Sequence, residues 1–403
     1  MINNNLIEKC EKQLFEKFKY FEDVALFNQE KVLNAFKKNH LALRHFVGTT
    51  GYGYGDEGRE TLNKVFADVF KSDSAICSPN IVSGTHALSL CLYGVLMPYD
   101  KALCITGKPY DTLNDVIYGN NIGSLSDYKV DFTCIDLKND KIDKEKIKEY
   151  FLINGKPKMI YMQRSRGYAW RDALSINDIE DAVSFVKSLG FDGCIMLDNC
   201  YGEFLDKKEP TEVGVNLMAG SMIKNPGGGI APTGGYVVGS NQYVEMVQNR
   251  LTAPSIGGEV GSYNNGYQYY FQGLFMAPHI VLQAVKSSLL FGAVVSELGY
   301  ETSPKLNDTP NDIIRAIKFN NKEQLISFIQ TIQKNSPIDS YVDALPWAMP
   351  GYEDEVIMAA GCFVQGSSIE LSADAPIRAP YIAYMQGGLT YEHAKIVLKN
   401  INL

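Results

Sequence analysis

Apolar positions recur at helical spacing over much of the first 70 residues. Residues 6–33 carry apolar side chains among lysines and glutamates at the period of an amphipathic helix, and residues 60–70 resume this pattern. Between them, residues 48–56 read Gly-Thr-Thr-Gly-Tyr-Gly-Tyr-Gly-Asp, which is too rich in glycine for the interior of a regular element. We therefore expect an N-terminal helical arm that ends in a glycine- and tyrosine-rich loop.

From about residue 75, short apolar runs alternate with helical stretches. Strands are predicted at residues 102–105, 159–162 and 194–197, and a helix at residues 176–189. Strands that alternate with helices require crossover connections, so we expect an α/β fold with a mostly parallel central sheet flanked by helices on both faces. Ligands of such sheets bind beyond the carboxyl ends of the strands, which points to Asp198 and Gln163.

The last quarter of the chain indicates a second, smaller domain. A long helix is predicted at residues 277–298, with Pro278 in its first turn, followed by a helix at residues 322–334 and strands at residues 361–364 and 368–371. The predicted organisation is a helical arm and Gly/Tyr loop at residues 1–55, a large α/β domain at 56–298 and a small α+β domain at 299–403.

Composition narrows the classes of partner. A net charge of -8 without a basic stripe argues against a nucleic-acid partner. No run of about 18 uncharged apolar residues and no signal-peptide pattern is present, so we expect a cytoplasmic protein without a membrane span. The eight scattered cysteines form no C-x-x-C pair and indicate reduced thiols, and the five dispersed histidines predict no metal centre.

The strongest candidate for chemistry is a lysine in a loop of small residues. Lys224 follows Ser221 by three positions and precedes the glycines at 227–229. Such an uncrowded amine can form a Schiff base with an aldehyde cofactor, although a surface lysine beside a glycine turn is the simpler alternative. Asp198, at the end of a predicted strand, could keep a pyridinium nitrogen protonated or could be only a turn residue. Together the two residues indicate pyridoxal 5'-phosphate (PLP) chemistry.

A second group of small residues suits a phosphate. Ser83, Gly84 and Thr85 form a turn that opens a predicted helix, where exposed N–H groups and the helix dipole favour anions. The alternative is an ordinary serine N-cap, and His86 in the same turn is more simply structural. Ser221 could add a hydroxyl donor to the phosphate.

Two further residues are candidates for the ring and the substrate. Tyr110 follows a predicted strand and could stack on a cofactor ring, or could cap the edge of the core. Arg378 lies in a predicted proline-containing loop at residues 372–380 and could clamp an α-carboxylate, or could form a surface ion pair. Sequence patterns of serine hydrolases and zinc proteases are absent from the sequence.

The motifs at residues 51–59, 83–87, 197–204, 221–229 and 372–378 resemble those of fold type I PLP enzymes. Within the cystathionine lyase and methionine γ-lyase superfamily, the chain is most similar to the bacterial aluminium resistance proteins, also described as methionine γ-lyase-like carbon–sulfur lyases. The resemblance implies Lys224 as the Schiff-base lysine, Asp198 as the pyridinium partner and Tyr110 over the ring. It also implies Gly84, Thr85 and Ser221 around the phosphate.

The resemblance further implies a homodimer or homotetramer whose active sites are shared between subunits. In the superfamily a tyrosine and an arginine of the neighbouring subunit reach the phosphate, and Tyr52 and Tyr54 occupy the corresponding place. This chain has a Gly-Tyr repeat in place of the usual Tyr-x-Arg. Which tyrosine acts, and whether Arg59 substitutes for the arginine, therefore stays open.

The reaction that we expect is β- or γ-elimination on a sulfur-containing amino acid. The freed Lys224 amine would take the α-proton, Arg378 would hold the carboxylate, and Tyr52 or Tyr110 would protonate the leaving thiolate. Aminotransfer would use the same lysine and aspartate, and a non-catalytic PLP-fold protein of the stress response is the other alternative. The family name "aluminium resistance" does not imply a metal site, and the sequence contains no cluster of carboxylates suited to a hard trivalent cation.

Overall fold

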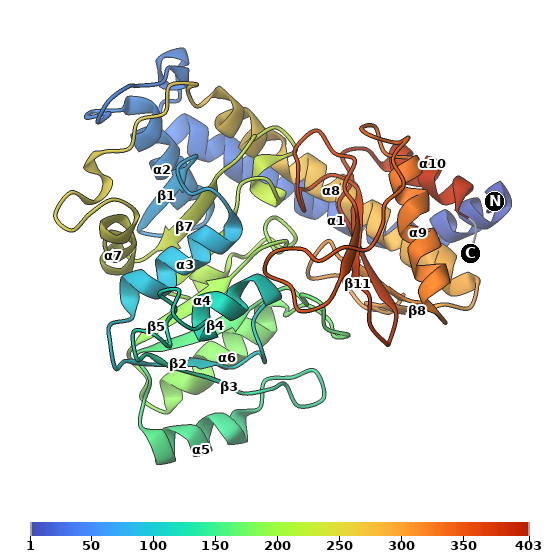
Figure 1. The fold of residues 1–403 in the computed structure, drawn as a ribbon. Coiled ribbons are helices and arrows are strands. Elements are labelled where there is room, and N and C mark those ends of the chain that lie inside the picture. Colours follow the sequence, from blue (N-terminus) through green and yellow to red (C-terminus); the bar gives the residue numbers. More distant parts are fainter. Residues whose placement is uncertain (1, 402–403) are drawn as a thin grey trace.

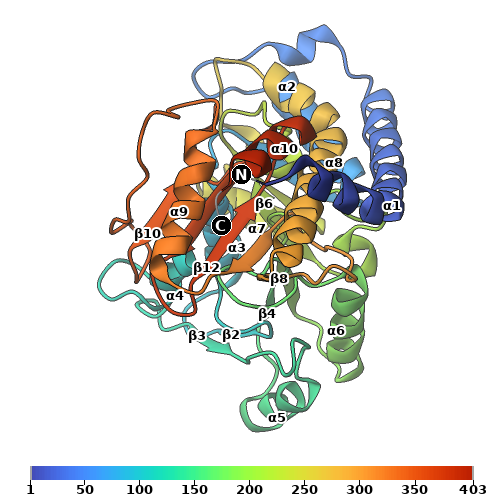
Figure 2. The same ribbon diagram turned by 90° about the vertical axis from the view of Figure 1, so that its right-hand side faces the viewer.

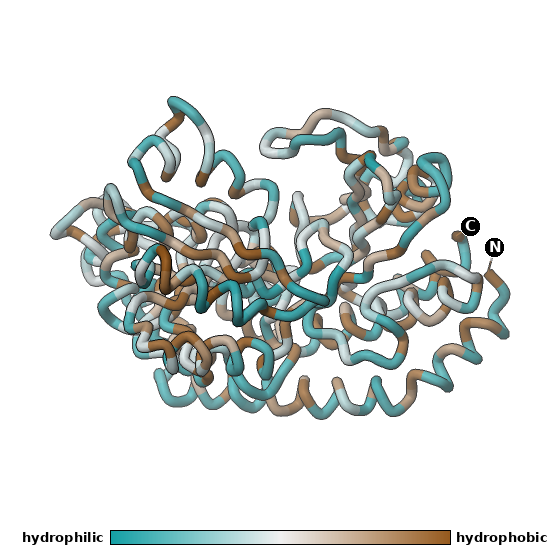
Figure 3. The backbone as a smooth tube through the Cα atoms, turned by 90° about the horizontal axis from the view of Figure 1, so that it is seen from below, coloured by the Kyte–Doolittle hydropathy of each residue, from teal (hydrophilic) through white to brown (hydrophobic). Residues whose placement is uncertain are grey.

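The computed structural model describes residues 2–401, which form a large and a small domain joined by long helices (Figure 1). The large domain contains a seven-stranded sheet and the small domain a five-stranded sheet. Helices α1 (Asn4–Lys38) and α8 (Gln268–Glu297) pack side by side along both domains. Viewed from below, α1 lies along one edge of the molecule with hydrophobic and hydrophilic stretches alternating, as expected for an amphipathic helix (Figure 3).

The large sheet has the strand order β1-β7-β6-β5-β4-β2-β3. Strands β2 to β6 run parallel, whereas β7 is antiparallel to both β1 and β6. The three strands predicted at residues 102–105, 159–162 and 194–197 are confirmed to within one residue. The bounds are β1 (Ser74–Ser78), β2 (Lys101–Cys104), β3 (Asp131–Cys134), β4 (Met159–Gln163), β5 (Cys194–Asp198), β6 (Leu217–Ser221) and β7 (Gly235–Gly239).

Helices cover both faces of this sheet and create two apolar cores. Leu103 of β2 packs into one core and its neighbours Ala102 and Cys104 into the other, because successive strand residues point to opposite faces. The predicted fold class is confirmed. The helices on one face are α3 (Gly84–Val95), α4 (Asn114–Tyr118) and α7 (Asn241–Leu251), and those on the other include α2 (Glu57–Val69), α5 (Lys144–Asn154), α6 (Ile176–Ser188) and α8.

The small domain is an antiparallel sheet in the order β10-β11-β12-β9-β8, packed against α9 and α8 (Figure 2). The first helix is tied to this domain, since Glu11 accepts hydrogen bonds from Tyr391 and Lys395, each at 2.8 Å. The bounds are β8 (Glu301–Ser303), β9 (Arg315–Lys318), β10 (Val356–Ala359), β11 (Ser372–Pro376), β12 (Ile382–Gln386), α9 (Lys322–Lys334) and α10 (Tyr391–Asn400).

Three expectations for the second half of the chain were wrong. Helix α8 begins at Gln268, so Pro278 lies inside the helix rather than in its first turn. Residues 361–364 and 368–371 lie in loops, and the strands are β10 and β11. Residues 372–376, predicted as part of a loop, form β11. This strand escaped notice because it alternates polar residues with alanine and lacks the bulky apolar residues typical of a strand.

Helix α8 is also the one helix in residues 2–401 that is long and apolar enough to cross a membrane, by length and composition alone. Its most apolar window is 72% buried inside the protein. Residues such as Phe271, Leu274 and Phe291 pack in the main core, which accounts for the apolar character without a membrane.

The small domain is anchored to α8 through a buried arginine. The side chain of Arg315 on β9 is fully buried, and its guanidinium donates to the carbonyls of Ser288, at 3.1 Å, and Pro304. Burial lowers the pKa of Arg315 to about 9. The guanidinium packs directly on Gly292, where an added Cβ would lie 2.7 Å from its Cζ.

We predict that Gly292→Ala destabilises the protein by about 1–3 kcal/mol, because the methyl group forces the guanidinium out of its hydrogen bonds. Chemical denaturation of the variant and the wild type measures this difference. Gln272→Ala, at an exposed position of the same helix, is the control and should change stability by less than about 0.5 kcal/mol. Equal stability of Gly292→Ala and wild type would contradict the anchoring role of Arg315.

Candidate active site

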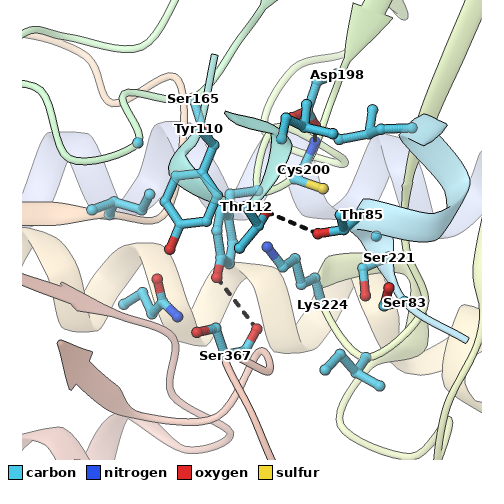
Figure 4. Close-up of a pocket in the computed structure, with 18 of the residues that line it drawn as sticks. Ser83, Thr85, Tyr110, Thr112, Ser165, Asp198, Cys200, Ser221, Lys224 and Ser367 are labelled. Atoms are coloured by element: carbon cyan, nitrogen blue, oxygen red, sulfur yellow. Dashed lines mark hydrogen bonds between the residues drawn. The ribbon is translucent and has the colours of Figure 1, made fainter. Parts of the chain in front are cut away.

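A cavity of about 240 Å³ lies where the carboxyl ends of the large-sheet strands meet the small-domain sheet. Its walls include residues from both domains. Figure 4 shows the Lys224 side chain pointing into the space between Tyr110 and the hydroxyls of Thr85 and Ser221. Asp198 also lines the cavity, so the structure brings together the lysine and the aspartate that the sequence singled out.

The chain holds Lys224 in a tight turn. Lys224 follows β6 by three residues and leads directly into the 3₁₀ turn η4 (Asn225–Gly227). An added Cβ at Gly227 would lie 1.7 Å from the carbonyl oxygen of Met222, so only glycine fits there. The Lys224 Nζ lies 3.8 Å from the ring centroid of Tyr201. Tyr201 itself has a positive φ of 70°, a strained conformation for a tyrosine that is common near functional sites.

The Lys224 amine and the Asp198 carboxylate stabilise each other's charged forms. Burial opposes the charge on Lys224, but Tyr201, Cys200 and Asp198 nevertheless raise its pKa above the usual value. Burial raises the pKa of Tyr201 to about 12, so this phenol is neutral at physiological pH and Asp198 is the effective anion. Burial also raises the pKa of Asp198, while the Cys200 N–H, which donates to Oδ1 at 3.0 Å, and the nearby Lys224 oppose the rise.

The turn that opens α3 forms the second part of the cavity wall. Ser83 is the N-cap of α3 and accepts a hydrogen bond from the N–H of His86 at 3.1 Å, as the N-cap alternative predicted. Ser83 also lines the cavity. The Thr85 and Thr112 hydroxyls lie 2.9 Å apart. An added Cβ at Gly84 would approach Ser221 Cβ to 3.2 Å, and the absence of that carbon leaves the helix N-terminus open. These hydroxyls and N–H groups suit an anion.

Tyr110 lines the cavity, and Gln163 positions it. The Gln163 Oε1 accepts a hydrogen bond from the Tyr110 N–H at 2.7 Å, and the Tyr110 hydroxyl lies 2.9 Å from that of Tyr352. Burial raises the pKa of Tyr110 well above its usual value, so its phenol keeps its proton. Gln163 itself does not contribute to the cavity wall.

Tyr52 and Tyr54 lie outside the cavity of their own chain. Their side chains are 72% and 68% exposed, and their rings contact each other at 5.6 Å between centroids. Arg59 is buried and donates to the carbonyls of Gly261 and Glu259, at 3.2 and 3.3 Å. Its guanidinium therefore fastens a loop of its own chain.

Arg378 also lies outside the residues that line the cavity. Its Nη1 lies 2.8 Å from the Asp354 carboxylate in a partly exposed ion pair. In this conformation Arg378 therefore forms the surface ion pair that was the alternative to a role in substrate binding. A role in holding the substrate would require the pair with Asp354 to open.

The sequence reasoning missed the small-domain side of the cavity. Asp374 of β11 and Tyr384 of β12 are cross-strand partners that face it together. Tyr168, from the loop after β4, also lines the cavity and donates a hydrogen bond to Asp374. On the large-domain side, Tyr201 was also missed as a site residue, although it follows Asp198 by only three positions. Asp374 reaches the site only through the packing of the two domains.

The fold is that of the type I PLP-dependent enzymes. A PLP-dependent Escherichia coli protein, YhfS, aligns with a TM-score of 0.62 at 16% identity, covering 94% of this chain and 97% of that one. A Campylobacter jejuni protein with the provisional description of an O-acetylhomoserine (thiol)-lyase aligns with a TM-score of 0.58 at 12% identity, covering 87% of this chain and 88% of that one. At such identities the likeness establishes the fold alone.

The chain belongs to the methionine gamma-lyase family, whose model matches residues 3–402. The uncharacterized Bacillus subtilis protein YnbB is 47% identical over 94% of this chain and 90% of its own length. A Clostridium novyi carbon–sulfur lyase involved in aluminium resistance is 48% identical, with a TM-score of 0.93 over 98% and 93% of the two chains. A Listeria monocytogenes protein with the provisional description of a cystathionine β-lyase involved in aluminium resistance is 44% identical, with a TM-score of 0.95 over 99% and 98%.

The buried carboxylate of Asp374 predicts a measurable pH effect on stability. Burial raises its pKa to about 6, although the Tyr168 hydrogen bond and nearby Lys224 lower it. The folded state therefore holds this proton more tightly than the unfolded chain, and folding loses stability as pH rises from about 4 to about 6. Above that range the charged group costs roughly 3 kcal/mol.

We expect Asp374→Asn, which cannot ionise, to gain in melting temperature relative to wild type as pH rises through this window. Thermal unfolding between about pH 4.5 and 7.5 measures the difference. Asp343→Asn, which removes an exposed carboxylate paired with Lys334, is the control and should show no such trend. A constant difference between Asp374→Asn and wild type at all pH values would contradict the shifted pKa.

Proposed function

We propose that the protein is a cytoplasmic PLP-dependent carbon–sulfur lyase, which releases a thiol from the β or γ carbon of a sulfur-containing amino acid. One observation carries the proposal. The Lys224 amine lies in a cavity with the buried carboxylate of Asp198 and the open, hydroxyl-lined N-terminus of α3. The family of carbon–sulfur lyase-like proteins to which the chain belongs supports it. All eight cysteines are free thiols, as expected in a reducing compartment.

The side chains present fit this cofactor. Ser83, Thr85 and Ser221, with the N–H groups of α3, would hold the phosphate, and Gly84 leaves the space for it. Asp198 would hold the proton on the pyridine nitrogen, and Tyr110 would lie against the ring. When bound, PLP supplies an aldehyde for a lysine amine and a protonated ring that withdraws electrons from the neighbouring carbon.

The residues of the cavity would move two protons. In β elimination, the Lys224 amine takes the proton from the α carbon, and the carbon–sulfur bond then breaks with the electron pair leaving on sulfur. In γ elimination, a proton must also leave the β carbon before the carbon–sulfur bond breaks. A neutral phenol in the cavity can supply a proton to the leaving thiolate, and Tyr110 lines the cavity and stays protonated, since burial raises its pKa well above the usual value. Hydrolysis then gives a 2-oxo acid and ammonia.

We also propose a homodimer or homotetramer in which subunits share active sites. Tyr52 and Tyr54 are largely exposed and lie outside their own cavity, which leaves either free to reach the phosphate site of a neighbouring chain. Arg59 is engaged with its own chain, so we assign the contact to a tyrosine. Arg378 would hold the substrate carboxylate after separating from Asp354.

Lys224→Ala tests the proposal directly. The wild-type protein should show the absorption band of PLP bound covalently to a lysine and should release 2-oxo acid from cystathionine or methionine. The variant should lose the band and at least about 1,000-fold of the activity, because both the anchor and the proton carrier are removed. Spectroscopy and a 2-oxo acid assay give the two readouts.

Lys305→Ala, at an exposed position of the small domain, is the matched control and should retain both signals. A band in wild type that survives Lys224→Ala would refute the assignment of the lysine. Absence of 2-oxo acid across a broad panel of sulfur amino acids would refute the lyase. Conversion of PLP to its amine form on adding an amino acid would instead identify an aminotransferase.

A further inference from the structure

The small-domain sheet presents a single carboxylate to the cavity. Asp374 on β11 is only 5% exposed. Its neighbours Ala373 and Ala375 pack in the main apolar core, whereas Asp374 points to the opposite face beside Tyr384. A buried strand position of this kind ordinarily holds an apolar side chain, since a buried charge is costly without a partner.

When the substrate arrives, no cation of the protein is left to pair with Asp374. Within the described residues, the only charged side chains that line the cavity are Asp198, Asp374 and Lys224. Under the proposed function, Asp198 serves the cofactor ring and the Lys224 amine is engaged with the cofactor. The arginines nearby have other partners, because Arg378 pairs with Asp354 and, under the proposed function, then holds the substrate carboxylate, while Arg166 lies 3.8 Å from a carboxylate oxygen of Asp312.

Four tyrosine rings pack together beside the carboxylate. The ring of Tyr168, whose hydroxyl donates to Asp374, lies 5.4 Å from Tyr110, 6.0 Å from Tyr352 and 5.1 Å from Tyr384, measured between centroids. Burial raises the pKa of Tyr168 well above its usual value, so the phenol is a neutral donor. A carboxylate among aromatic rings attracts a cation both directly and through the ring faces. The same carboxylate repels an anion, and an apolar group makes no favourable electrostatic interaction with it.

We propose that Asp374 and the tyrosines Tyr110, Tyr168, Tyr352 and Tyr384 form a subsite for an ammonium group at the far end of the substrate. The leaving thiol of the preferred substrate therefore carries an amine. Asp374 is a specificity-determining residue that selects this class of thiol over neutral and anionic ones. This inference rests on the proposed function for its catalytic readout, but the binding preference can be measured separately.

Three substrates of similar size test the subsite: S-aminoethylcysteine, S-propylcysteine and S-carboxymethylcysteine, with the homocysteine counterparts for γ-elimination. The holoenzyme is assayed near neutral pH for kcat/KM of thiol release and, by calorimetry, for equilibrium binding. We expect the amine to be preferred to the propyl compound by about tenfold or more, and the carboxylate to be the poorest. Wild type alone therefore gives a decisive comparison.

Asp374→Asn keeps the size of the side chain and an oxygen for the Tyr168 hydroxyl while removing the charge. It should bring the amine and propyl compounds to within about twofold of each other, while kcat/KM for the propyl compound changes little. Asp343→Asn, an exposed carboxylate of the same domain, should keep the wild-type preference. If Asp374 only anchors Tyr168, the variant, which retains an acceptor for this hydrogen bond, would keep the wild-type preference among the three compounds, which would overturn the proposal.

The two proposals can fail independently. Thiol release from the amine and propyl compounds at equal efficiency by wild type would overturn the subsite and leave the lyase intact. Preferential binding of the amine compound without thiol release from any compound would support the subsite and overturn the lyase. A preference that survives in Asp374→Asn would overturn the role of this residue.

Discussion

Two carboxylates and one amine share a buried cavity, and this charge balance governs the organisation of the site. Lys224 needs a nearby anion because burial opposes its charge, and Asp198 meets this need. Asp374 adds a second negative charge from the other domain. Such an arrangement is unfavourable in an empty cavity and becomes favourable when ligands contribute positive charge. Under our proposals, these cationic groups are the protonated cofactor ring and the amine at the far end of the substrate.

The protein accepts strain and close contacts to hold these groups in place. Tyr201 keeps a positive φ beneath the lysine, and Gly227 permits an approach to Met222 that no side chain could allow. At the other wall, Gln163 uses its side-chain oxygen to hold the Tyr110 backbone. Hydrogen bonds and close backbone contacts therefore hold the cavity wall in place. Such preorganisation is expected where a lysine amine must change partners during a reaction.

The large-domain half of the site could be predicted from the sequence because its signals are local. Asp198 ends an apolar strand, Lys224 lies in a loop of small residues, and Ser83 opens a helix. Parallel strands then bring these loops to one edge without further information. The same locality accounts for the accurate strand bounds. The start of α8 was predicted wrongly because a proline often lies in the first turn of a helix. In this protein α8 begins ten residues before Pro278.

The small-domain half could not be predicted, since it depends on how two sheets face each other. Asp374 is 176 residues from Asp198 in the chain, and β11 carries alternating small residues that resemble a loop. Its position is set by α1 and α8, which span both domains, and by Arg315, which fastens β9 to α8. Under the proposed function, the large-domain residues supply the chemistry common to PLP enzymes. In our proposal the choice of substrate depends on β11, because Asp374 is the charged residue of the cavity that does not bind the cofactor.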